Sequence, residues 1–79
     1  MPYIAIKCYP KDDATKREAV ERINQLFLEV WGCPHEALTI SVEEVQPENW
    51  VEQVVKPEIE PKMEHMMLIS GKKTEKMNG

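Results

Sequence analysis

Pro2, the second residue of the chain, is the residue whose chemistry depends most on its position. Proline is small, as methionine-removing peptidases require, so we expect Met1 to be cleaved and the mature chain to begin at Pro2. A proline within a chain is a tertiary amide without an N–H, whereas a terminal proline is a secondary amine that can take a proton. Burial beside other cations lowers the pKa of such an amine from its reference range of about 7.7–8.0. Pro2 is therefore a candidate general base, although a second-position proline that merely begins a strand is the simpler interpretation.

Other side chains of catalytic or metal-binding type are scattered along the chain. His65 lies in a Met-rich segment, residues 63–67, which suggests either a soft-metal site or an apolar subunit contact with one exposed histidine. We favour the subunit contact and expect no metal, because one histidine without a nearby cysteine is a poor metal site. Cys8 is expected to be a small buried hydrophobe. Cys33 is a weak nucleophile candidate, because no basic residue is its neighbour in sequence.

Length and charge limit the classes of function. The 79 residues predict one domain, 1–79, too short to bury a large core, and its two cysteines make no disulfide framework, so we expect a homo-oligomer. A net charge of -4 argues against a nucleic-acid surface, while a local group of Lys and Arg still suits a small anionic substrate. The sequence has no signal-like or membrane-spanning apolar run, so we expect a cytoplasmic protein without membrane contact.

Two segments alternate between apolar and polar residues, which is the pattern of half-buried strands. They span residues 2–9 and 38–45. Glu43 and Glu44 end the second strand. Because neighbours in a strand point to opposite faces, we do not expect these two carboxylates to act as a catalytic pair.

A long amphipathic segment separates the two predicted strands. Apolar residues at three- and four-residue spacing predict a helix over residues 14–31. Either Asp12 or Asp13 is placed to cap its first free N–H groups. Gly32 is placed to end the helix in a left-handed conformation, and Pro34 prevents its resumption.

Together these elements predict a single βαβ unit with parallel strands, which is an α/β fold. The apolar stripe of the helix covers one face of the strand pair in this arrangement. Parallel strands normally have both faces covered, yet the opposite face carries the modest side chains Tyr3, Ala5, Thr39 and Ser41. We therefore expect this face to pack against another subunit, which completes a larger sheet.

The remainder of the chain predicts short helices. A turn at residues 46–49 leads into a helix from Trp50 through Val55, which we expect to close at Pro57. The Met-rich stretch over residues 62–69 is helical by composition. Residues from about 70 to 79 are polar and basic and are expected to form a mobile tail unless a partner subunit holds them.

Four segments make the chain resemble the 4-oxalocrotonate tautomerase family. They are Met1-Pro2 and residues 6–11, 45–50 and 58–64. The likeness is greatest for a slightly longer bacterial branch whose members are dimers, and the extended C-terminal portion also favours a dimer over a hexamer. The resemblance implies a tautomerase that interconverts the keto and enol forms of a small 2-hydroxy-dienoate or 2-keto acid. It also implies that no metal or organic cofactor is needed.

The resemblance assigns roles to individual residues. It makes Pro2 the general base and acid. Lys11 occupies the place of a basic side chain that holds the substrate carboxylate, without the bidentate fork that arginine offers. Trp50 falls where the family has an aromatic that walls the proline pocket. Without the resemblance, Trp50 is better interpreted as a hydrophobic anchor for its short helix.

A second arginine that many hexameric members carry aligns near Thr39, where this chain has no charge. Arg17, Lys7 or a residue of another subunit would replace it, or the natural substrate lacks the group it would bind. Arg17, near the start of the helix, is our candidate for polarising the substrate carbonyl. The missing charge also supports a second hypothesis, a non-catalytic βαβ oligomerisation module that binds a partner through its Met-rich segment.

Overall fold

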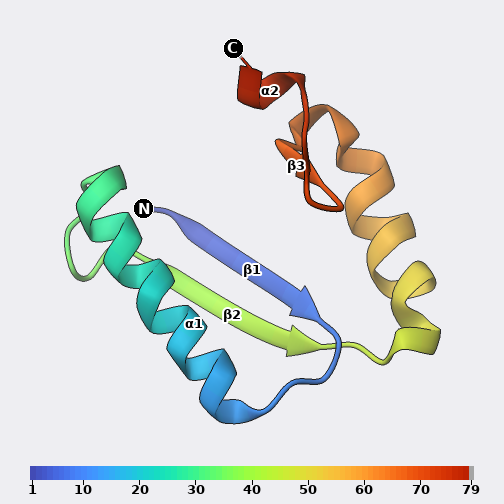
Figure 1. The fold of residues 1–79 in the computed structure, drawn as a ribbon, viewed down its shortest axis with the longest axis horizontal. Helices are drawn as coiled ribbons and strands as arrows, with labels where there is room; N and C mark the ends of the chain where they lie inside the picture. The colour runs from blue at the N-terminus through green and yellow to red at the C-terminus, as the bar shows by residue number, and fades with distance from the viewer. Residues whose placement is uncertain (79) are drawn as a thin grey trace. The chain divides into compact units, whose positions relative to one another are not determined.

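A computed structural model describes residues 1–78 of the chain (Figure 1). These residues form two compact units, of which the first spans Met1–Gln46 and the second begins at Pro47. Each unit has its own secondary structure and is described by itself. The single domain expected from the sequence stays a prediction.

The first unit is the βαβ arrangement that the sequence predicts. Strand β1 spans Tyr3–Cys8, helix α1 spans Asp13–Leu26 and strand β2 spans Thr39–Glu44. The two strands pair in parallel, with Tyr3 opposite Thr39 and Cys8 opposite Glu44. Helix α1 lies along this pair and runs against the strand direction (Figure 1). The predicted α/β fold with parallel strands is confirmed.

Local hydrogen bonds fix both ends of the long helix. Asp12 is the N-cap, and its carboxylate accepts a hydrogen bond from the backbone N–H of Thr15 at 2.9 Å. The helix continues beyond α1 as a π-helical segment, η1, over Phe27–Trp31, and ends at Gly32 with a φ of 79°. Glycine adopts this left-handed conformation without steric cost, so the predicted stop at Gly32 is confirmed.

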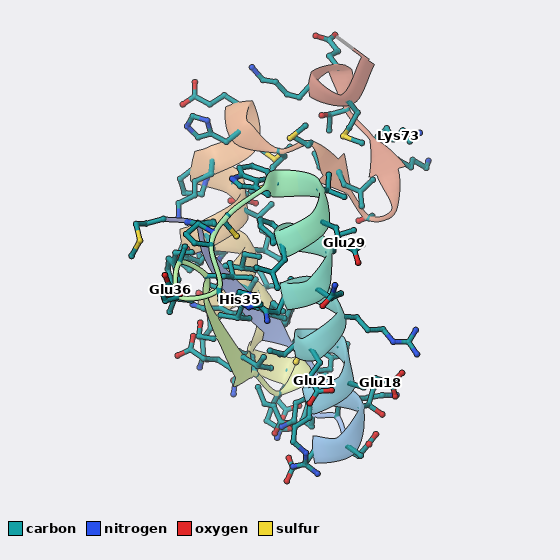
Figure 2. The ribbon with its side chains drawn as sticks, turned by 90° about the vertical axis from the view of Figure 1, so that its left-hand side faces the viewer. Glu18, Glu21, Glu29, His35, Glu36 and Lys73 are labelled. Atoms are coloured by element: carbon teal, nitrogen blue, oxygen red, sulfur yellow. The ribbon has the colours of Figure 1, made fainter. Side chains whose placement is uncertain are left out.

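The outer face of α1 is charged and exposed. Glu18, Glu21 and Glu29 project from the helical segment into solvent (Figure 2). Arg22 forms an ion pair with Glu18, one turn earlier, at 2.5 Å. Such a face suits solvent, and no helix within residues 1–78 is both long and apolar enough to cross a membrane.

Helical turns form the first part of the second unit, and they do not stop at Pro57 as the sequence predicted. The segments are η2 (Pro47–Asn49, 3-10), η3 (Val51–Ile59, π) and η4 (Glu60–His65, 3-10). Pro57 lies inside η3, where the N–H groups bond to carbonyls five residues earlier instead of four. Because a proline in an α-helix clashes with the carbonyl four residues before it, the wider helix accommodates Pro57, and the expected end there was wrong.

The last part of the second unit is a hairpin and a short helix. The helix expected over residues 62–69 is correct only at its start, because η4 ends at His65 and strand β3 spans Leu68–Ile69. Strand β3 pairs antiparallel with β4, Lys72–Lys73, and helix α2 spans Glu75–Asn78. Ser70 and Gly71 between the strands have positive φ angles of 49° and 81°, which suit a two-residue hairpin turn. These elements occupy the stretch expected to be a mobile tail, whose last residue, Gly79, lies outside the described residues.

The described residues bury few hydrophobic side chains. Those that are buried are Ala37, Val45 and Val54. Many large hydrophobic side chains are instead exposed, namely Met1, Tyr3, Tyr9, Leu26, Val30, Trp31, Val51, Met63, Met67, Leu68 and Met77. So small a core is typical of short chains that obtain further burial by associating with other chains.

Val54 and Val51 provide a matched test of where the second unit is packed. They lie in the same segment, η3, but Val54 is 5% exposed and Val51 is 52% exposed. Val54→Ala should lower the free energy of unfolding by about 2 kcal/mol, because it removes buried methyl groups and leaves a cavity. Val51→Ala should change it by less than about 0.5 kcal/mol, as measured by urea unfolding. Equal losses for the two variants would contradict this difference in burial.

Candidate functional site

Pro2 lies at the start of β1 and is tied to the start of β2. It is half-buried, and its carbonyl accepts a hydrogen bond from the backbone N–H of Thr39 at 3.2 Å. Met1 before it is 97% exposed, so the Met1–Pro2 bond lies open to solvent. Thr39 is the position near which the second arginine of the resembled family aligns. The structure thus places an uncharged residue beside Pro2 where such an arginine would stand.

Lys11 and Arg17 lie at the other end of the same unit. Strand β1 has six residues, which at 3.3 Å per residue span about 20 Å. Lys11 follows the end of this strand, and α1 begins there, with Arg17 in its second turn (Figure 1). One chain therefore carries both cations to the same end of the unit and keeps them away from Pro2.

The loop that carries Lys11 is attached to the end of β2 by two hydrogen bonds. The backbone N–H of Val45 donates to the carbonyl of Cys8 at 2.8 Å. The backbone N–H of Lys11 donates to Oε2 of Glu44 at 3.0 Å. Sequence reasoning set Glu44 aside as half of an unsuitable carboxylate pair. The signal that points to it is the strand register, because Glu44 lies opposite Cys8, at the end of β1 from which the loop departs.

Glu44, at the end of β2, and Lys16, in the first turns of α1, form an ion pair. Nζ of Lys16 lies 2.7 Å from Oε2 of Glu44 and 3.2 Å from Oδ1 of Asp13. The backbone N–H of Lys11 and then the Lys16 ammonium lower the pKa of Glu44. The carboxylates of Glu44 and Asp13 raise the pKa of Lys16. These contacts therefore favour the charged forms of Glu44 and Lys16.

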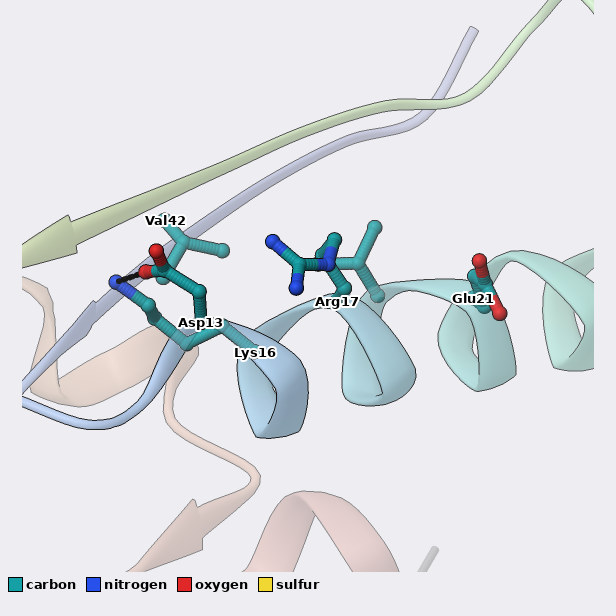
Figure 3. A pocket seen from close by; sticks show the side chains of 6 residues that line it. Asp13, Lys16, Arg17, Glu21 and Val42 are labelled. Atoms are coloured by element: carbon teal, nitrogen blue, oxygen red, sulfur yellow. Dashed lines mark ion pairs between the residues drawn. The ribbon is translucent and has the colours of Figure 1, made fainter.

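Two cavities adjoin the first turns of α1. One of about 400 Å³ is lined by Asp13, Lys16, Arg17, Val20, Glu21 and Val42 (Figure 3). The other, of about 240 Å³, is lined by Ile6, Cys8, Tyr9, Lys11, Thr15, Lys16, Ala19, Val20 and Val42. Within residues 1–78, neither Lys11 nor Arg17 forms an ion pair, whereas Lys16 forms two. Arg17 lines the first cavity and Lys11 lines the second, so neither cavity is lined by both residues. An unpaired cation beside apolar side chains suits a small carboxylate with an apolar body.

The remaining candidate residues lie elsewhere in the chain. Trp50 is half-buried in the second unit, at the residue before η3. His65 is exposed, and its Nε2 lies 3.6 Å from Oε1 of Glu64. The Cys33 thiol is half-buried and donates to the carbonyl of Phe27 at 3.6 Å, next to the end of the helix. Within residues 1–78, no three His, Cys, Asp or Glu side chains are grouped as metal ligands.

Comparison with known proteins links this arrangement to one enzyme class. Residues 2–58 match the family model described as "Tautomerase enzyme". The chain is 29% identical over 69 residues to Tautomerase PptA of Enterobacter sp. (strain 638), covering 85% of this chain and 91% of that protein. It is 30% identical over 69 residues to Tautomerase PptA of Shigella sonnei (strain Ss046), with the same coverage. It is 29% identical over 68 residues to a probable tautomerase of Xylella fastidiosa (strain 9a5c), covering 85% and 83%.

The charge state of Glu44 is directly measurable. Its pKa should lie below the ordinary value of 4.5, and Lys16→Met should move it only part of the way back, because the Lys11 N–H is the larger cause. A ¹³C NMR titration of the side-chain carboxyl measures both values. Arg22→Met, which removes a cation paired elsewhere on α1, is the control and should leave the pKa of Glu44 unchanged.

The same shift predicts a pH dependence of stability. Because the pKa of Glu44 is lower in the folded chain than in the unfolded chain, its charged form stabilises the fold above about pH 4.5. That contribution is lost as the pH falls through the lowered pKa. The difference in unfolding free energy between wild type and Glu44→Gln should therefore be constant near neutral pH and shrink in acid. A Glu44 carboxyl that titrates at its ordinary value would contradict both expectations.

Proposed function

The chain belongs to the tautomerase family, and on that premise we propose that it interconverts the keto and enol forms of a small carboxylate-bearing substrate, with Pro2 as the proton carrier. The substrate class is a 2-hydroxy-dienoate or the enol of a 2-keto acid. The observation that carries the proposal is the position of Pro2. This proline is the second residue, half-buried at the start of β1, and follows an exposed Met1.

The proposed reaction uses one nitrogen as both base and acid. Removal of Met1 frees the amine of Pro2, which takes the proton of the substrate hydroxyl as the enol oxygen becomes a carbonyl. The protonated amine then returns that proton to a carbon of the conjugated system, so the substrate gains and loses no atoms. Burial next to a cation favours the neutral amine, which is the form that accepts the proton.

Lys11 is proposed to hold the substrate carboxylate and Arg17 to polarise the carbonyl that forms. Lys11 follows the end of β1 opposite Pro2, and the strand between them is about 20 Å long. Arg17, in the second turn of α1, lines a cavity with Val42. We therefore propose that each site combines Pro2 of one chain with Lys11 of a second copy in a homodimer. The many exposed hydrophobic side chains support such association, and Tyr3, beside Pro2, is 67% exposed. Trp50 is proposed as the apolar wall that excludes water from the amine.

Pro2→Ala tests the role of the amine, because it exchanges a secondary amine for a primary one. We expect kcat/KM for ketonisation of the phenylpyruvate enol, followed by ultraviolet absorbance, to fall by at least about tenfold, a part of what a positioned general base contributes. Pro34→Ala makes the same substitution at an exposed loop position, where the proline nitrogen is an amide and not an amine, and should have no effect. Intact mass must show that Met1 is absent from each protein. Equal rates for Pro2→Ala and wild type, or an active protein that retains Met1, would remove Pro2 from the mechanism.

Mixed dimers test whether the site is shared between two chains. Pro2→Ala and Lys11→Ala chains should each be weakly active alone. After the two are refolded together, about a quarter of wild-type activity should return, because half of the random dimers are mixed and each has one intact site. Mixing Pro2→Ala with the double variant Pro2→Ala/Lys11→Ala is the control and restores nothing. If the first mixture also restores nothing, Pro2 and Lys11 do not meet across a dimer.

A further inference from the structure

The loop between β1 and α1 carries the proposed carboxylate anchor, Lys11, and the side chain of Glu44 contacts the loop at the backbone of this residue. We propose that Glu44 is a positioning residue that fixes where Lys11 stands, an inference that rests on the proposed role of Lys11. Glu44 itself does not touch the substrate in this proposal. It acts through the backbone of Lys11 and through Lys16.

The contacts of Glu44 fix the loop from the side of β2. Oε2 accepts a hydrogen bond from the Lys11 N–H at 3.0 Å, across 33 residues of sequence. The carbonyl of Cys8, just before the loop, accepts from Val45 at 2.8 Å. Asp12, the residue after Lys11, caps α1. The loop is therefore held at its start by the strand pair, at its end by the helix cap and at Lys11 by Glu44.

Oε2 of Glu44 also affects which of the nearby lysines can bind an anionic ligand. Oε2 of Glu44 lies 2.7 Å from the Lys16 ammonium, which Asp13 contacts from its other side at 3.2 Å. Lys16 lines both cavities, but its charge is matched by these carboxylates. Lys11 lines the smaller cavity, and its ammonium has no ion pair within residues 1–78. Glu44 thus neutralises the charge of Lys16, which would otherwise compete for the ligand, while it holds the backbone of Lys11.

The position of Lys11 matters for binding the substrate carboxylate, because a lysine ammonium acts as a point charge. Arginine orients a carboxylate through two parallel hydrogen bonds, whereas an ammonium fixes orientation only through its location. A carboxylate anchor that moves by about 1 Å places the reacting atoms poorly, and such a shift costs up to about 10²-fold in rate. The loop that carries Lys11 must therefore be held more firmly than a loop carrying arginine would be.

Glu44→Ala and Glu44→Gln separate this holding role from a simple charge effect. Glu44→Ala removes the acceptor for the Lys11 N–H, so KM for the phenylpyruvate enol should rise about tenfold with a smaller change in kcat. Glu44→Gln keeps an oxygen acceptor for the Lys11 N–H but loses the charge that pairs with Lys16, so its KM should rise less than that of Glu44→Ala. Neither change should alter the KM for the methyl ester of the same substrate, which lacks the carboxylate. Glu43→Ala removes the neighbouring exposed carboxylate, which makes no hydrogen bond within residues 1–78, and serves as the matched control.

If only the negative charge of Glu44 mattered, Glu44→Ala would change KM in the opposite direction. If Glu44 acted only by repelling the substrate carboxylate, Glu44→Ala would lower KM, as Glu43→Ala would, and that result would overturn the proposal. Hydrogen exchange of the Lys11 amide gives a readout that needs no activity, since the amide should be protected in wild type and in Glu44→Gln but exchange faster in Glu44→Ala. An unprotected Lys11 amide in wild type would also refute the role of Glu44. An inactive wild-type protein with a protected amide would instead refute the proposed function.

Discussion

The length and direction of β1 constrain everything else in this small protein. A strand of six residues, paired in parallel with β2, places Pro2 at one end and the loop with Lys11 at the other. No rearrangement within one βαβ unit brings these two ends together, because the helix that connects the strands must run back along them. The unit also leaves large hydrophobic side chains exposed, among them Tyr3, Tyr9, Leu26, Val30 and Trp31. The proposed second copy would address both problems at once, since it would cover apolar surface and bring another β1 into reach.

Charged side chains near the C-terminal end of β1 pair with one another within a single chain. Asp13 and Glu44 match the charge of Lys16, whereas Lys11 and Arg17 near them form no ion pair within residues 1–78. This division arises from short contacts between the start of α1 and the end of β2, so it is a property of one chain. The proposal is therefore that each chain forms its own anion-binding end, and that association places this end beside Pro2 of another chain.

Elements governed by local pattern were predictable from the sequence. The alternation around Ile4 and Ile40, the helical stripe and the glycine stop predicted β1, β2, the helix formed by α1 and η1 together, and the turn at Gly32 within one or two residues. The continuation of helix past Pro57 was not predictable, because it depends on a switch to π-helical bonding that no residue type signals. Glu44 was missed for a related reason. Its role depends on the register between two strands, which a search for neighbouring carboxylates ignores.

The most direct test of the shared site is a ¹⁵N NMR titration of the Pro2 amine in the mature protein, with and without Lys11. Within one chain, Pro2 and Lys11 are separated by strand β1, which is about 20 Å long, against a screening length of about 8 Å at physiological salt. Lys11→Ala can therefore change the pKa of Pro2 only if the lysine of another chain stands beside it. The account predicts a Pro2 pKa below the usual range of about 7.7–8.0 that rises in Lys11→Ala. A pKa that is the same in both proteins would contradict it.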